Sequence, residues 1–155
     1  MCIIIQFNSI YNFIFNSIII IRKQMGRKIS LGMMIVLYLG AGINHFWHPE
    51  AYYPLIPPYL PYHKIINIVS GAVEIILGIL LFFTLTRKIA VAGIIIMLVL
   101  FIPAHIYMIQ KNGCMSPAMC MPAWVAWIRL FPLQFILMWW AFWHYNEKAS
   151  QTSRC

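Results

Sequence analysis

Four long apolar runs follow one another along this sequence, and most of its prolines and charged residues lie between or beside these runs. The runs are residues 29–45, 64–83, 89–109 and 123–143. An α-helix needs about 20 apolar residues to cross a bilayer, so the pattern predicts four transmembrane helices. Because only residues 84–88 separate the second run from the third, we expect an antiparallel hairpin there. The fold class predicted is an all-α transmembrane four-helix bundle.

An additional hydrophobic segment, residues 3–21, precedes the four runs, but Asn, Ser and Gln dilute it and Arg22 and Lys23 follow it. Three interpretations stay open: a weak extra span, a signal-like segment, or upstream sequence translated before a true start at Met25. A signal peptide carries its positive charge before its apolar core, which weakens the second. We therefore divide the chain into an N-terminal hydrophobic extension (1–24), a four-helix membrane domain (25–146) and a short polar cytoplasmic tail (147–155).

Composition and charge support a membrane protein. The sequence is 63% hydrophobic and 9% charged, against roughly 25% charged residues in a soluble domain. The net charge of +8 is spread over short clusters, which favours contact with the lipid bilayer over a nucleic-acid partner. Lys and Arg concentrate on one side of the predicted membrane, which places both core termini in the cytoplasm and the protein in the inner (plasma) membrane. The basic residues assigned to the cytoplasmic side are Arg22, Lys23, Arg27, Lys28, Arg87, Lys88, Lys148 and Arg154, against Lys64 and Lys111 outside.

Glu74 is the acidic residue that lies inside a predicted span. A carboxylate near the middle of a bilayer costs at least about 2.5 kcal/mol, so it should face the bundle interior and find a partner. Helical spacing places Asn67, Gly71 and Gly78 on the same side of the helix as Glu74, with Ser70 beside them. This small, polar face predicts close contact with a neighbouring helix.

A polar pocket is expected in the outer half of the bundle. Helix rise places Glu74 about 15 Å and Arg129 about 9 Å below the outer surface, while His45 and His105 lie nearer the outer ends of their helices. The proline-rich loop, residues 49–61, contains five prolines and should form a rigid lid over this end. We expect Glu74 and Arg129 to form a buried charged pair, either around a quinone headgroup, proton path or small substrate, or simply as a structural contact. For the two histidines, a hydrogen bond to a neighbour is the favoured role over a catalytic one.

Cys114 and Cys120 lie in one predicted outer loop, where oxidising conditions favour a disulfide. A structural staple is the favoured interpretation; exchange with a redox partner and Cu(I) binding with the neighbouring methionines stay open. The His45-x-x-His48 pair has only Glu50 to complete a ligand set, so no metal site is predicted. The chain contains no aspartate, phosphate-binding loop or nucleophile elbow, which argues against a self-contained hydrolase or a nucleotide-driven pump.

A series of short motifs resembles the DoxX-like membrane proteins, in the branch related to MauE. The motifs are Gly42-Ile-Asn-His-Phe46, Pro49, Ile56-Pro-Pro-Tyr-Leu-Pro61, Ser70-Gly-Ala-Val-Glu74, Gly78, Thr86-Arg87 and Pro103-Ala-His-Ile-Tyr-Met108. The resemblance implies a bacterial four-helix membrane protein in a family linked to thiosulfate:quinone oxidation, thiol systems and disulfide maturation. The sequence departs from that pattern at His105, where many relatives have Asn. It also has Cys-x5-Cys in place of the Cys-x-x-Cys of a thiol-disulfide exchanger.

These observations lead to a DoxX-like integral membrane protein that serves a redox, thiol-related or quinone-linked system. No motif in the sequence indicates a bound cofactor. A quinone is the cofactor that we consider. The expected partner is a membrane or periplasmic redox protein, and a homo-oligomer is also considered. The alternative is a non-enzymatic scaffold or a small solute or proton transporter, so whether the protein is an enzyme stays open. The residues proposed for the pocket are Glu74, Arg129, His105, His45 and Asn67, with Cys114 and Cys120 as the disulfide.

Overall fold

The computed structural model describes residues 2–116 and 119–145. The chain divides into two compact units, residues 1–34 and residues 35–155. The first unit consists of the N-terminal part of a single helix, whereas the remaining helices, the loops and the cavity belong to the second. The predicted cytoplasmic tail, 147–155, lies outside the described residues.

The first helix, α1 (Cys2–Trp47), runs without interruption. The N-terminal extension is thus helical and continuous with the first predicted span, because nothing between Arg22 and Met25 breaks a helix; the domain boundary after residue 24 stays a prediction. Four helices in the described part of the chain are long and apolar enough to cross a bilayer: Phe15–Trp47, His63–Phe82, Arg87–Gln110 and Ala123–Tyr145. The protein is therefore a multi-pass membrane protein, and the predicted all-α fold class is confirmed.

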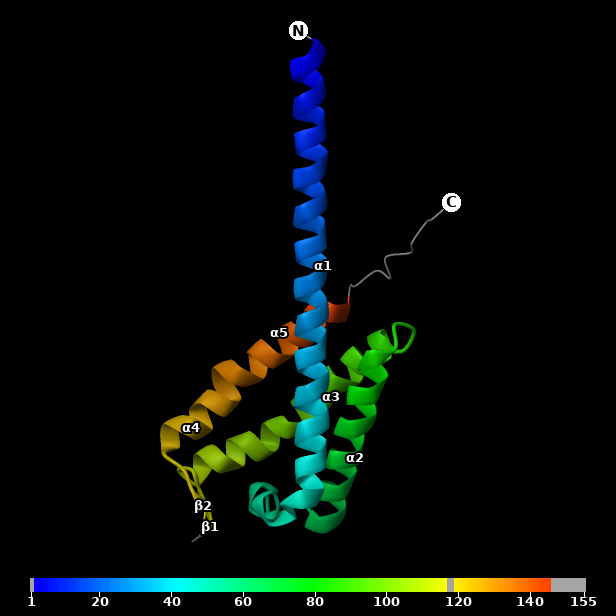
Figure 1. Cartoon of the computed structure of the whole chain (residues 1–155). Helices are drawn as coiled ribbons and strands as arrows, with labels where there is room; N and C mark the ends of the chain where they lie inside the picture. The colour runs from blue at the N-terminus through cyan, green and yellow to red at the C-terminus, as the bar shows by residue number, and fades with distance from the viewer. Residues whose placement is uncertain (1, 117–118, 146–155) are drawn as a thin grey trace. The chain divides into compact units, whose positions relative to one another are not determined.

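Helices α2 (His63–Phe82) and α3 (Arg87–Gln110) begin and end within two residues of the predicted bounds. They pack against each other as the expected antiparallel hairpin (Figure 1). The hydroxyl of Thr86 donates a hydrogen bond of 2.7 Å to the carbonyl of Leu80, which satisfies one of the carbonyls left open at the end of α2.

The fourth span is interrupted, which corrects the prediction of one continuous helix over 123–143. It consists of α4 (Ala123–Ile128), a π-helical segment η3 (Arg129–Leu133) and α5 (Gln134–Tyr145). Phe131 has an extended backbone (φ −141°, ψ 117°) immediately before Pro132. A proline has no N–H to donate and disfavours a helical conformation in the residue before it, so the break falls at this residue. Both α4 and α5 pack against α3.

Helices α1 and α2 approach closely at a pair of glycines, as the small-residue face of α2 predicted. A Cβ atom added at Gly71 would lie 2.6 Å from the Cβ of His45 and 3.0 Å from the carbonyl oxygen of Gly42. A Cβ added at Gly42 would lie 2.8 Å from the carbonyl oxygen of Gly71. The absence of side chains on both helices brings their backbones together, and this contact positions His45 next to Asn67.

Two connections lie at the same end of the bundle. The proline-rich loop contains two 3₁₀ turns, η1 (Pro49–Ala51) and η2 (Tyr53–Leu55), and η2 contacts α2 and α3. Between α3 and α4, strands β1 (Cys114–Ser116) and β2 (Met119–Cys120) pair antiparallel, with Cys114 opposite Cys120. A disulfide joins these two cysteines, and β1 contacts η2. The disulfide hairpin and the proline-rich loop therefore adjoin each other.

Candidate functional site

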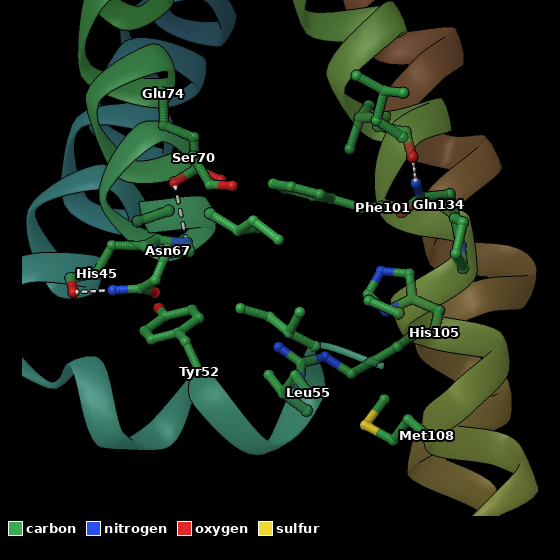
Figure 2. A pocket seen from close by; sticks show the side chains of 18 of the residues that line it. His45, Tyr52, Leu55, Asn67, Ser70, Glu74, Phe101, His105, Met108 and Gln134 are labelled. Atoms are coloured by element: carbon green, nitrogen blue, oxygen red, sulfur yellow. Dashed lines mark hydrogen bonds and ion pairs between the residues drawn. The ribbon is translucent and has the colours of Figure 1, made fainter. Parts of the chain in front are cut away.

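A mostly apolar cavity of about 510 Å³ lies in the second unit, and its walls come from α1, α2, α3, η3, α5 and the proline-rich loop. All five polar residues proposed from the sequence line it: Glu74, Arg129, His105, His45 and Asn67. Figure 2 shows His45, Asn67 and Glu74 on one side of the cavity and His105 and Gln134 on the other. Leu55 of the loop lies between them at one end. We call the α1/α2 side the first wall and the α3/η3/α5 side the second wall.

The first wall is organised by a reciprocal contact between His45 and Asn67. Asn67 Nδ2 donates to the carbonyl oxygen of His45 at 2.9 Å, and Asn67 Oδ1 lies 2.8 Å from His45 Nδ1. The residue four positions after His45 is Pro49, which has no N–H, so the helix itself cannot supply a donor to this carbonyl. Asn67 replaces the missing donor and is 2% exposed.

Glu74 lies about two helical turns beyond Asn67 and is 5% exposed. Its Oε2 is 3.7 Å from His45 Nε2, and this oxygen has no hydrogen-bond partner in the described part of the chain. The expected direct pair between Glu74 and Arg129 is not found among the described residues. Both side chains line the cavity, but the group within ion-pair distance of the carboxylate is His45, because the glycine contact draws α1 against α2.

The proline-rich loop closes over His45. The ring of Tyr52 stacks on the His45 ring with 3.7 Å between centroids and an interplanar angle of 25°. Asn44 Nδ2 donates to the Tyr52 hydroxyl at 2.7 Å, and Asn44 Oδ1 lies 3.1 Å from His48 Nδ1. The loop thus covers this end of the cavity, as the sequence predicted for a lid, and it does so through a specific contact with a wall residue.

The second wall carries the cation. Arg129 is the first residue of the π-helical segment, and Gln134 begins α5 directly after the break. The side chain of Gln134 donates to the carbonyl oxygen of Leu98 and lies on the same side of the cavity as the ring of His105 (Figure 2). Of the two acidic residues in the described ranges, Glu50 and Glu74, neither forms an ion pair with Arg129. The second wall therefore presents a guanidinium and an imidazole to the cavity.

Sequence reasoning missed two polar residues of the cavity, Tyr52 and Gln134. Tyr52 is one of several aromatic residues in the loop, and no local pattern distinguishes it from the others. Gln134 was detectable, since it is a polar residue inside an apolar run, which is the signal that singled out Glu74. Ser70 was placed beside the polar face of α2, and it also lines the cavity.

The Cys114–Cys120 disulfide lies beyond the cavity end of α3. Met108 lines the cavity, and its carbonyl oxygen accepts a hydrogen bond of 3.0 Å from the N–H of Gly113, the residue before Cys114. Gly113 has φ +81°, and a Cβ there would collide with the carbonyl oxygen of Met121, so this tight turn requires glycine. The described His, Cys, Asp and Glu residues form no group of three that could hold a metal ion.

The arrangement suits a ligand that is largely apolar and carries hydrogen-bonding oxygens at two separate positions. The first wall offers an acid with an adjacent imidazole, which can give or take a proton. The second wall offers a fixed positive charge, which can stabilise an oxygen that gains negative charge. The largely apolar lining lowers the local dielectric constant, which strengthens both interactions.

Comparison with known proteins supplies the family but no described activity. No curated protein and no solved structure matches the chain. One family model matches residues 34–145, which is nearly the whole described part of the second unit and includes every residue of the cavity. The chain belongs to this family, which is described as a domain of unknown function (DUF8561).

Proposed function

We propose that this protein is a membrane component of a redox or thiol system and that its cavity binds the headgroup of a quinone. The observation that carries the proposal is the apolar cavity with hydrogen-bonding groups on opposite walls. A quinone ring is flat and apolar, with its carbonyl oxygens on opposite sides and an isoprenoid tail that remains in lipid. The cavity volume of about 510 Å³ is in the usual range of small-molecule sites, roughly 300–1,000 Å³.

In this proposal each wall has its own task. His45 and Glu74 lie near one carbonyl oxygen of the quinone and exchange protons with it. Arg129 and His105 lie near the other and stabilise the negative charge that develops there during reduction. Asn67 fixes the imidazole ring of His45, so that little rearrangement is needed there when the ligand changes charge.

The electrons come from thiols. A dithiol of a membrane or periplasmic partner exchanges with the Cys114–Cys120 disulfide, and the two thiols formed then reduce the quinone. Each turnover transfers two electrons and two protons, so a dithiol and a quinone become a disulfide and a quinol. The contact of β1 with η2, whose Leu55 lines the cavity, supports this coupling because it brings the disulfide hairpin to the cavity end of the bundle.

The proposed location rests on the distribution of charges along the sequence. Lys and Arg are concentrated in the segments assigned to the cytoplasmic side, which favours cytoplasmic core termini in an inner membrane and an outward-facing disulfide. An oxidising outer compartment suits the disulfide. A relationship to the DoxX-like proteins, with their links to quinone and thiol systems, is part of the proposal and rests on the short motifs quoted above.

A transporter for a proton or a small solute is the second candidate. Two observations favour it: the Glu74 oxygen without a hydrogen-bond partner, and the interruption of the fourth span beside Arg129. Interrupted helices of this kind line substrate sites in many transporters. In sealed vesicles, Glu74→Gln should then change a flux of protons or solute while the fold stays intact; equal flux in both proteins would remove this candidate.

Quinone binding is tested with the purified full-length protein in lipid nanodiscs. A short-tail benzoquinone and a short-tail naphthoquinone are titrated, and binding is followed by quenching of tryptophan fluorescence. We expect saturable binding that weakens about tenfold or more in Arg129→Gln, because a hydrogen bond to a charged group contributes about 1.5–3 kcal/mol. The control Lys64→Gln, an exposed cation on α2, should bind like the wild type. Unsaturable partitioning in all three proteins would refute the quinone site.

The proposed thiol exchange at Cys114 and Cys120 is tested separately by trapping free thiols in intact cells, with and without a mild reductant. Cycling of Cys114 and Cys120 between reduced and oxidised forms, lost in Cys114→Ser, would support an active redox pair. A disulfide that every physiological reductant leaves intact, and whose loss has no effect, would reduce the hairpin to a structural staple.

A further inference from the structure

The hydrogen bonds of the first wall determine where the proton of His45 lies. A backbone carbonyl can only accept, so the end of the Asn67 amide that faces the His45 carbonyl, 2.9 Å away, must be the NH₂ group. The other end is then the amide oxygen, which also can only accept. Because this oxygen lies 2.8 Å from His45 Nδ1, that nitrogen must carry a hydrogen.

The other ring nitrogen of His45 faces Glu74. Its Nε2 lies 3.7 Å from Glu74 Oε2, and both groups are buried. Two arrangements are compatible with this geometry: a neutral imidazole beside a protonated carboxyl, or an imidazolium beside a carboxylate. If this proton leaves, a lone pair on Nε2 and a carboxylate face each other in a buried, largely apolar site, which is unfavourable. Each stable arrangement of the empty cavity therefore keeps one proton on this pair.

The groups around the pair leave the cavity as the direction in which this proton can reach a ligand. Tyr52 covers one face of the His45 ring, and Asn67 occupies Nδ1. Tyr38 of α1 lies near the Glu74 carboxyl and is 4% exposed. The remaining direction from Glu74 is the cavity, where Oε2 has no hydrogen-bond partner among the described groups and where Arg129 and His105 form the second wall.

We propose that His45 and Glu74 form a proton-loading pair that delivers one proton to a ligand oxygen in the cavity, and that Asn67 is the positioning residue that holds His45 in the Nδ1–H form. The ligand in this step is the quinone, so the step rests on the proposed function. As the quinone takes two electrons from the dithiol, its oxygen forms an O–H bond and the pair loses the matching proton. The pair is left with a carboxylate and a neutral imidazole, whose negative charge Arg129 balances. Oxidation of the dithiol releases two protons, of which one reloads the pair and the other joins the second quinone oxygen, so electrons and protons balance.

The first experiment needs no quinone. Full-length protein with ¹⁵N-labelled histidine is placed in lipid nanodiscs, and the signal lost in His45→Gln identifies the ring of His45 by NMR. We expect Nδ1 to be protonated in the wild type and in Asn67→Asp, since Asp still offers an acceptor oxygen. In Asn67→Leu, which offers none, the signal should shift toward the Nε2–H form that free histidine prefers. An unprotonated Nδ1 in the wild type, or identical spectra in wild type and Asn67→Leu, would overturn the proposal.

The second experiment follows the proton during reduction. Infrared difference spectra are recorded as bound short-tail quinone is reduced by dithiothreitol. A carboxyl or imidazole band should change in the wild type and in Glu50→Gln, whose substituted acid is exposed, and should be lost in Glu74→Gln. The same bands in all three proteins would refute proton delivery by the pair. If no quinone binds, the proposed function fails, whereas the NMR result still decides whether Asn67 fixes the proton on His45.

Discussion

The two walls of the cavity bring polar groups into an apolar bundle by different means. On the first wall, α2 is unbroken, and a glycine contact lets His45 and Asn67 satisfy each other. On the second wall, the helix itself is interrupted, and Arg129 and Gln134 lie on either side of the break at Phe131 and Pro132. The first wall therefore depends on a contact between two helices, and the second wall depends on an interruption within one helix.

This difference should appear as a difference in tolerance to substitution. On the first wall, a single substitution of a small or polar residue disturbs the contact between two helices, because each such residue is the partner of a residue on the other helix. On the second wall, the break is fixed locally by Pro132, and each polar side chain has fewer obligatory partners. Three substitutions test this comparison, from the largest expected effect to the smallest.

Asn67→Leu should cause the largest loss of stability. It leaves the carbonyl oxygen and the Nδ1 atom of His45 unpaired, and each buried group left without a partner costs about 1–3 kcal/mol, so we expect about 2–6 kcal/mol in total. The matched change on the second wall, Gln134→Leu, should cost about 1 kcal/mol. Leu98, its carbonyl partner, retains the N–H of Ile102 four residues on. Thermal unfolding of both variants in one detergent measures the difference, and equal losses would contradict the comparison.

Gly71→Ala should cause an intermediate loss. Its Cβ would lie 2.6 Å from the Cβ of His45, and overpacking of this kind costs about 1–3 kcal/mol. Gly40→Ala in α1 is the control, because a Cβ there meets nothing within 4 Å. That control should gain about 0.5–1 kcal/mol from lower chain entropy. Unfolding midpoints that move in opposite directions would support the close α1–α2 contact, and a gain in both would argue against it.

Tyr52→Phe should have the smallest effect. The substitution keeps the stacking on His45 and removes only the hydrogen bond of 2.7 Å from Asn44. We expect a loss of about 0.5–1 kcal/mol, the low end of the range for one hydrogen bond, because Asn44 is exposed. Tyr59→Phe, at a loop tyrosine that is 71% exposed, should be neutral. Differential scanning of the two variants beside the wild type decides this, and a loss as large as that of Asn67→Leu would mean that the loop is part of the first wall.

The sequence by itself determined the membrane class, the bounds of α2 and α3 and the inward face of α2. Hydrophobic periodicity carries this information locally, so Asn67, Gly71, Glu74 and Gly78 could be assigned to one buried face from spacing alone. The proximity of Cys114 and Cys120 was also predictable, since only five residues separate them.

Only the tertiary structure decided which polar groups meet. Asn67 is 22 residues from His45 in sequence, and their contact depends on the rotation and register of two helices set by the Gly42–Gly71 approach. For the same reason depth arithmetic placed Glu74 and Arg129 at similar levels but could not show that His45, not Arg129, lies beside the carboxylate. Spacing along one helix fixes a face and a depth. The distance between two side chains on different helices also requires the packing of their backbones, which the linear pattern does not contain.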